Sequence, residues 1–322
     1  MSAGARRPGH EQEVERMTQP DAARITVVGD ALIDELRDPS GAREFVGGAA
    51  LNVAVGLALL GEDVTLVAMV GDDEPGARIR AFLDDYGVRL VASPSERGSS
   101  RAVSDRAEGG EPRYEFNDAA QHRRLAFDAA TREALSEADL VVVSCYPFDD
   151  EEQVSALLDA IPEPGRRLVV DGNPRAGMLH DRERFLDNLV RVAGRSLLVK
   201  AGDEDADLLA GEPLDDFVER LRSAGGDPAV LATAGRDGAA VHAGALDVHA
   251  DIVALPGPVI DTMGAGDATL AAIVHRIAID GLPATAGAWS DALAEAMTIA
   301  AATVRHEGAL LRTGTTSPQL GS

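Results

Sequence analysis

The chain is poor in cysteine, aromatic residues and basic residues. Cys145 is the one cysteine among 322 residues, so no internal disulfide forms, and we expect a buried structural thiol in a reducing cytoplasm. Aromatic residues make up only 3%, so the core is built from Ala, Val, Leu and Ile. The 54 acidic residues outnumber 30 basic ones, for a formal net charge of -24. Such a surface repels nucleic acid and anionic membranes, and we expect neither as a partner.

Long apolar runs and targeting segments are missing as well. No stretch approaches the roughly 18 consecutive apolar residues of a membrane span. Residues 1–23 are polar and lack the apolar centre of a signal peptide, so we interpret them as a mobile tail. Residues 313–322 are interpreted as a second tail. The 289 or so residues between them, 24–312, suit one large domain.

Three common catalytic motifs are also absent. No G-x-x-x-x-G-K-[ST] occurs, which excludes a P-loop enzyme. The turn after the first predicted strand, Gly29-Asp30-Ala31, lacks the second glycine of a dinucleotide-binding fingerprint. No H-E-x-x-H occurs, and the seven histidines are scattered. P-loop NTPases, dinucleotide oxidoreductases and zincin-type proteases are therefore disfavoured.

Short β-rich runs alternate with helical patterns, which predicts an α/β fold with a mostly parallel sheet and helices on both faces. The predicted strands are 25–28, 64–70, 140–144, 167–171, 196–200 and 229–233, with a late antiparallel pair at 239–242 and 247–252. The predicted helices are 49–60, 75–86, 151–161, 182–192, 214–223, 265–279 and 291–304. Between 90 and 118 the alternation stops, and short β segments at 100–104 and 113–116 flank Gly109-Gly110. We expect this region, with residues 29–46, to form a small β lid.

Residues 261–267, Asp-Thr-Met-Gly-Ala-Gly-Asp, are the most informative segment, because two glycines and a carboxylate stand where a turn meets a predicted helix. A helix N-terminus presents unpaired N–H groups and partial positive charge, which suits an anion. A bound phosphate would repel a carboxylate at this position. The carboxylate is therefore expected to do chemistry on a group beside the phosphate. The segment therefore predicts phosphoryl transfer with Asp267 as the base. The alternative is an ordinary capped turn.

A second glycine-rich motif supports the first. Residues 47–52 read Gly-Gly-Ala-Ala-Leu-Asn and lead into the predicted helix that ends near Gly61. Together, in this order and spacing, the two motifs resemble the signatures of the ribokinase-like (PfkB) family of sugar and nucleoside kinases. The resemblance covers residues 24–312. It implies a three-layer α/β sandwich with a small β lid, and an ATP-dependent enzyme that requires Mg²⁺.

The resemblance assigns the chemistry to the C-terminal motif. Asp267 is expected to accept the proton of a substrate hydroxyl as that oxygen attacks the γ-phosphorus. The backbone N–H groups of Gly264, Ala265 and Gly266 are expected to form an anion hole for the transferring phosphoryl group.

The resemblance places the sugar in the N-terminal half. Asp34 is expected to hold sugar hydroxyls, because an ionised carboxylate offers two acceptor oxygens; its alternative is a loop or capping role. Asn52 is expected to bind the sugar, or else to satisfy a core hydrogen bond. Gly47 and Gly48 are expected to approach the substrate and act as a lid hinge, or else to form a simple turn.

Further residues are expected to serve the nucleotide. They are Lys200, Thr233, Gly235, Gly238, Gly308, Asn173 and Arg175. Several follow predicted strands, and the carboxyl ends of parallel strands carry ligands in open sheets. Arg175 suits bidentate phosphate contact, but a surface ion pair is an equal alternative.

Two carboxylates are candidate metal ligands. Asp205 follows the strand that ends at Lys200, where relatives have a Glu linked to Mg²⁺ placement and an Asn or Ser at the position of Gly202. Both positions depart from that pattern, and helix-start acids are the alternative. Asp261 is a candidate for a monovalent cation such as K⁺.

The small residues Ala49 and Ala50 after the glycine pair favour a fructokinase-like or 2-keto-3-deoxygluconate kinase-like enzyme that takes an unphosphorylated hexose or keto-sugar. A ribose or nucleoside kinase is the runner-up. A non-catalytic sugar- or nucleotide-binding protein is the alternative from another class. The protein is expected to be a monomer, or a homodimer joined through the β lid.

Overall fold

The computed structural model describes residues 22–38, 41–105, 113–161, 167–313. Its main sheet has nine strands in the order β13-β12-β11-β10-β9-β8-β1-β4-β5, parallel except for β12 and β13. The strands are β1 Arg24–Gly29, β4 Asp63–Met69, β5 Arg89–Ser93, β8 Leu140–Ser144, β9 Leu168–Asp171, β10 Leu198–Gly202, β11 Ala229–Thr233, β12 Ala239–Ala243 and β13 Leu246–Ala250. The predicted mostly parallel sheet is confirmed.

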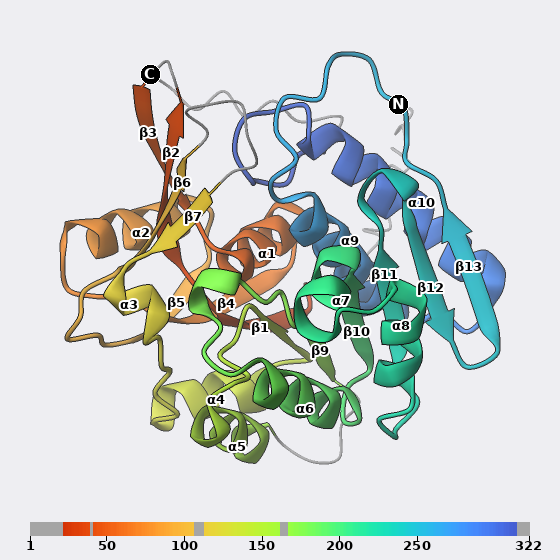
Figure 1. Cartoon of the computed structure of the whole chain (residues 1–322), viewed down its shortest axis with the longest axis horizontal. Helices are drawn as coiled ribbons and strands as arrows, with labels where there is room; N and C mark the ends of the chain where they lie inside the picture. The colour runs from red at the N-terminus through yellow and green to blue at the C-terminus, as the bar shows by residue number, and fades with distance from the viewer. Residues whose placement is uncertain (1–21, 39–40, 106–112, 162–166, 314–322) are drawn as a thin grey trace, which may run out of the picture.

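Helices cover both faces of this sheet and bury two separate hydrophobic cores (Figure 1). Alternate residues of a strand face opposite sides, so Val27 of β1 packs into one core and Val28 into the other. The first core is closed by α1 Ala49–Leu59, α2 Glu74–Asp85, α9 Ala265–Asp280 and α10 Ala286–Thr303. The second is closed by α4 Ala129–Glu137, α5 Glu151–Ala160, α6 Arg182–Ala193, α7 Asp203–Ala210 and α8 Leu214–Arg222. The fold is a three-layer α/β sandwich.

A smaller four-stranded sheet projects from one end of the main sheet (Figure 1). Its order is β3-β2-β6-β7, built from β2 Leu32–Asp38, β3 Gly41–Gly47, β6 Ser100–Asp105 and β7 Arg113–Phe116. The predicted lid boundaries were too wide at two places. Gly29 ends β1, and residues 90–93 belong to β5, the edge strand of the main sheet. The predicted turn at Gly109-Gly110 lies outside the described residues.

Four helices differ from the sequence predictions. The last helix begins at Ala286 rather than residue 291, because Thr285 caps it by accepting from the N–H of Ala288 at 3.2 Å. Two short helices, α4 and α7, were not predicted. Both are short, and α4 begins at Asp128, whose side chain accepts from the N–H of Thr131. The short helix α3 Asp118–Gln121 follows the small sheet.

The two predicted tails lie almost wholly outside the described residues, and their mobility stays a prediction. The inner end of the first one is fixed, however. The N–H of Ala23 donates to Glu62 Oε2 at 2.9 Å, just before β1 begins. Ala23, which the predicted tail includes, is therefore bonded to the main domain.

Candidate active site

The motif at residues 261–267 folds as a turn followed by the first turn of α9. Gly264 is the N-cap residue, with φ of 76°, in the left-handed region that favours glycine. A Cβ at Gly264 would lie 2.1 Å from the carbonyl oxygen of Ala309, so no larger residue fits there. Ala265 and Gly266 open the helix, where N–H groups lack intrahelical partners. The turn therefore places backbone N–H groups at the positive end of a helix, and that of Ala265 also donates to the carbonyl oxygen of Thr262 at 3.4 Å.

Asp267 lies in this first turn and is joined to the N-terminal half of the chain. Its Oδ2 accepts a hydrogen bond from Asn52 Nδ2 at 2.9 Å, and both side chains are buried. Asn52 Oδ1 accepts no hydrogen bond from the residues that the structure describes. The contact brings the two sequence motifs together, although 215 residues separate them.

Burial raises the pKa of Asp267 to about 6. The hydrogen bond from Asn52 opposes this shift, and Asp171 adds to it because a second negative charge disfavours ionisation. Arg175 and Lys200 lower the pKa by attraction. The result is a carboxylate that is ionised at neutral pH and close enough to that pH to exchange a proton, as general-base catalysis requires.

The start of α1 is fixed by close backbone packing. Gly48, its N-cap residue, has φ of 113°, and a Cβ there would lie 2.9 Å from the carbonyl oxygen of Asp30. Glycine has no side chain to cap the helix. Asp30 Oδ1 does so instead, by accepting from the N–H of Ala50 at 3.0 Å. A Cβ at Gly47 would meet nothing within 4 Å among the described residues, so that side of the turn is open.

Asp34 lies on the small sheet, on the strand next to the one that leads into α1. It is half-buried on β2, between Phe45 of β3 and Ala102 of β6. Strand β3 ends at Gly47 and the chain continues directly into α1, which carries Asn52. The predicted sugar residues thus come from the lid and the adjoining helix.

The end of β9 and the middle of β10 supply a buried ion pair. Lys200 Nζ lies 3.2 Å from Asp171 Oδ1, and their side chains are 8% and 0% exposed. Burial opposes the charge of Lys200, but the carboxylates of Asp171, Asp205 and Asp267 outweigh it and raise the pKa of the lysine. Asp171 was not predicted as a site residue. The feature of the sequence that could have indicated it is an acidic residue at the end of an apolar strand.

Asn173 and Arg175 follow β9 in the connection to the short helix Ala176–Met178. Asn173 is buried and takes a left-handed φ of 39°, which is uncommon outside glycine and costs backbone strain. Arg175 is exposed, and it acts electrostatically on Asp267 and Asp30. The ion-pair alternative for Arg175 and its phosphate role are both still predictions.

The candidate metal ligands are partly engaged by the backbone. Asp205 Oδ2 accepts from the N–H of Gly202 at 2.8 Å and so caps α7, as its alternative reading anticipated. Burial raises the pKa of Asp205 to about 6, against the attraction of Lys200. Within the described ranges no three His, Cys, Asp or Glu side chains gather to hold a metal. A single carboxylate still fits Mg²⁺, which keeps several waters and binds substrate phosphates.

Asp261 serves the turn before α9. Its Oδ1 accepts from the N–H of Met263 at 3.1 Å, and its Oδ2 from the N–H of Gly308 at 3.4 Å. Gly308 has φ of 83°, and a Cβ there would lie 3.7 Å from Phe45 of β3. The loop after α10 therefore touches both the Asp261 turn and the lid.

The predicted nucleotide turn joins β11 to β12. Thr233 ends β11, and its hydroxyl lies 3.5 Å from the carbonyl oxygen of Ala201. Gly235 takes φ of 50° in an open position, so a backbone approach by a ligand is sterically free there. Gly238 is glycine for a local reason, because a Cβ would lie 2.2 Å from the carbonyl oxygen of Ala250.

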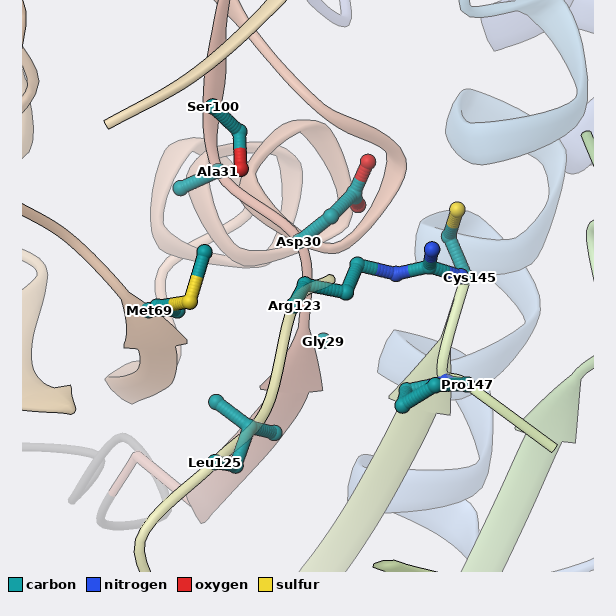
Figure 2. A pocket seen from close by; sticks show the side chains of 9 residues that line it. All are labelled: Gly29, Asp30, Ala31, Met69, Ser100, Arg123, Leu125, Cys145 and Pro147. Atoms are coloured by element: carbon teal, nitrogen blue, oxygen red, sulfur yellow. The ribbon is translucent and has the colours of Figure 1, made fainter. Parts of the chain in front are cut away.

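Asp30, Arg123 and Cys145 line a small pocket that the sequence did not predict (Figure 2). They come from the ends of β1 and β8 and from the segment after α3. Burial raises the pKa of Asp30, opposed by the hydrogen bond from Ala50 and by Arg123. Cys145 is buried with a left-handed φ of 50°, and burial raises the pKa of its thiol far above the ordinary range. The expected unreactive structural thiol agrees with this environment.

Comparisons with known proteins assign this fold to a class, the α/β sugar phosphotransferases. A family model described as pfkB family carbohydrate kinase matches residues 21–314, and the chain belongs to this family. A fructokinase of Klebsiella pneumoniae is 29% identical over 295 residues, which span 89% of this chain and 95% of that protein. A D-beta-D-heptose 7-phosphate kinase of Bordetella bronchiseptica is 29% identical over 295 residues, 84% of this chain and 87% of that protein.

Solved structures show the same fold. A fructokinase from Vibrio cholerae, in a form with fructose, ADP and calcium bound, has a TM-score of 0.73 and 21% identity over 89% of this chain and 94% of its own. A ribokinase from Thermotoga maritima has a TM-score of 0.68 and 18% identity over 89% of this chain and 94% of its own. None of the helices in the described part of the chain has the length and apolarity to cross a membrane.

Proposed function

We propose that this sugar kinase transfers the γ-phosphoryl group of ATP to a hydroxyl of an unphosphorylated hexose or keto-sugar, as fructokinases do. Asp267 removes the proton of the attacking hydroxyl. The N–H groups of Gly264, Ala265 and Gly266 receive the charge that spreads over the phosphoryl oxygens. The curated relatives of known activity that support this substrate class include the Klebsiella fructokinase.

The hydrogen bond between Asn52 and Asp267 carries the proposal. It puts the helix that follows the sugar-binding lid in contact with the helix that begins at the anion hole. A base must reach both the substrate hydroxyl and the region where the phosphoryl group arrives. The buried amide holds the Asp267 carboxylate in place and leaves its Oδ1 for the substrate proton.

The nucleotide is assigned to the other side of the anion hole. Thr233, Gly235, Gly238 and Gly308 are proposed to surround it, with Asn173 and Arg175 on the phosphate side. Asp205 is proposed to hold Mg²⁺ through water, and Asp261 to lie in a site for K⁺. When bound, Mg²⁺ would neutralise charge on the phosphate oxygens.

A coupled assay of ADP release tests the function directly. The panel comprises fructose, other hexoses, 2-keto-3-deoxygluconate, ribose, nucleosides and a heptose 7-phosphate, each with Mg-ATP and with or without K⁺. We expect the highest kcat/KM with an unphosphorylated hexose or keto-sugar. Preference for ribose, a nucleoside or the phosphorylated heptose would contradict the substrate class. Tight sugar binding without turnover of any compound would contradict the catalytic role and favour a binding protein.

A further inference from the structure

Lys200 is the only lysine in the chain. The 30 Lys and Arg residues are otherwise all arginine. It is not on the surface, where lysine is common, but buried at 7% exposure on β10. Lysine carries a compact ammonium, whereas the guanidinium of arginine is a wide planar fork. A chain that uses arginine everywhere else therefore keeps the small cation at one buried position beside the anion hole.

Two contacts define the surroundings of this ammonium. The first is the ion pair with Asp171, which faces Lys200 in register on the neighbouring strand β9, with 3.2 Å between Nζ and Oδ1. Asp171 Oδ2 is buried and accepts no hydrogen bond from any described residue. Desolvation makes such pairs poor stabilisers compared with apolar packing. Stability alone is thus a weak reason for the pair.

The second contact is with Gly266, in the first turn of α9. A Cβ built on Gly266 would lie 3.3 Å from Lys200 Cε and 3.5 Å from Nζ. Gly266 is helical and is not among the residues with left-handed φ, so its backbone conformation does not require glycine. A methyl group at this position would crowd the end of the lysine side chain, so Lys200 packs closely against the first turn of α9. The ammonium lies directly behind the anion-hole turn.

We propose that Lys200 is a positioning residue for the anion hole: held by Asp171, it packs against Gly266 and places positive charge behind the N–H groups that receive the transferring phosphoryl group. This inference rests on the proposed kinase function. It gives Lys200 a role without contact to the nucleotide, in place of the direct contact suggested above. Asp205 and Asp267 bring further negative charge to the same region.

The charges around Lys200 indicate that its ammonium affects the chemical step of the reaction. Phosphoryl transfer moves negative charge between the attacking, transferring and leaving oxygens. Buried carboxylates near this region oppose that charge, and a buried ammonium offsets them in a low-dielectric setting. Since the pair is fixed before the nucleotide arrives, no reorganisation is needed in the transition state. Its removal is therefore expected to lower kcat more than nucleotide affinity.

The double variant Lys200→Met/Asp171→Asn separates a functional from a structural role. Lys200→Met alone leaves the buried charge of Asp171 unpaired, and Asp171→Asn alone leaves the buried ammonium without its partner. The double change removes both charges. We expect a melting temperature close to that of the wild type, a KM for Mg-ATP within about threefold, and a kcat lower by about 10- to 100-fold. Arg220→Met/Glu212→Gln is the matched control, because it removes an exposed pair on and beside α8.

Two kinetic outcomes would overturn the proposal. A stable double variant with wild-type kcat would make the pair purely structural. A higher KM for Mg-ATP with unchanged kcat would make Lys200 a direct nucleotide ligand. If the wild type phosphorylates no sugar, the proposed function fails instead, and the contact is tested without turnover.

That test uses the single lysine as a probe. Labelling with [ε-¹⁵N]lysine gives one side-chain ammonium signal from the whole protein. We expect Gly266→Ala, which allows a helical backbone, to shift this signal because the new methyl group crowds Lys200. A signal that does not move in this variant would overturn the contact between Lys200 and the anion-hole turn, whatever the enzyme's activity.

Discussion

At the scale of single residues, the environment of Asp267 determines how the protein responds to pH. Its pKa of about 6 results chiefly from burial, opposed by the hydrogen bond from Asn52. A base acts only when deprotonated, so we expect kcat to be constant above pH 7 and to fall as the pH drops through about 6. A pH profile of kcat at saturating sugar and Mg-ATP measures this. An acid limb centred near pH 4 would contradict a buried base.

The same pKa also affects stability. The folded state holds a proton on Asp267 more tightly than the unfolded chain, whose ordinary value is 3.8, so ionisation costs stability as the pH rises from about 4 to 6. We expect Asp267→Asn to raise the free energy of unfolding at pH 8 by about 1–3 kcal/mol. The new amide can also donate to Asn52 Oδ1, which lacks a donor among the described residues.

This gain is expected to shrink below pH 6 and to be small at pH 4, where Asp267 is neutral in the folded state and about half ionised in the unfolded chain, with its ordinary value of 3.8. Urea titrations of the two proteins at pH 8 and pH 4 measure it. A variant that is less stable than the wild type at pH 8 would show that the carboxylate is held by more favourable contacts than those described.

At the scale of elements, α1 depends on a cap from another segment. Asp30 accepts from the N–H of Ala50, because the N-cap residue Gly48 has no side chain. We expect Asp30→Ala to lower the free energy of unfolding by about 1–2 kcal/mol. Asp30→Asn keeps an acceptor without the buried charge and should lose less. Equal losses in urea titrations of the two variants would show that Asp30 does not cap the helix through this oxygen.

The sequence predicted most of the helices and strands and missed three short helices, α3, α4 and α7. The buried strand β8 and helix α1 were found because their apolar runs are continuous. The helices α4 and α7 are short. They begin at Asp128 and Gly202, and these residue types are equally common in ordinary turns. Asp171 and Asp30 were missed as site residues for a related reason. Only the packing of distant strands shows that their carboxylates are buried beside the predicted site.

At the scale of the whole molecule, the proposed site is shared between two sheets. Asp34 belongs to the small sheet, while Thr233 ends β11 and Lys200 lies within β10 of the main sheet. We therefore expect Asp34→Ala to weaken sugar binding by about 10- to 100-fold, since hydrogen bonds to a charged group are strong. Nucleotide affinity should change by less than about threefold.

Calorimetry with sugar and with Mg-AMPPNP checks this separation. Glu115→Ala, an exposed change on β7 of the same small sheet, is the control and should leave both affinities unchanged. Equal losses for sugar and nucleotide in Asp34→Ala would contradict the division of ligands between the two sheets. Whether the lid also joins two copies of the chain stays a prediction, which sedimentation velocity decides.

The central claim is that Asp267 is the base of a sugar kinase, and the kcat of Asp267→Asn in the ADP-release assay tests it most directly. Asp280→Asn, at the exposed end of the same helix, is the matched control. We predict that Asp267→Asn loses about 10²- to 10⁴-fold in kcat, with its melting temperature preserved or raised and with sugar and nucleotide still bound. Turnover equal to that of the wild type would contradict the claim.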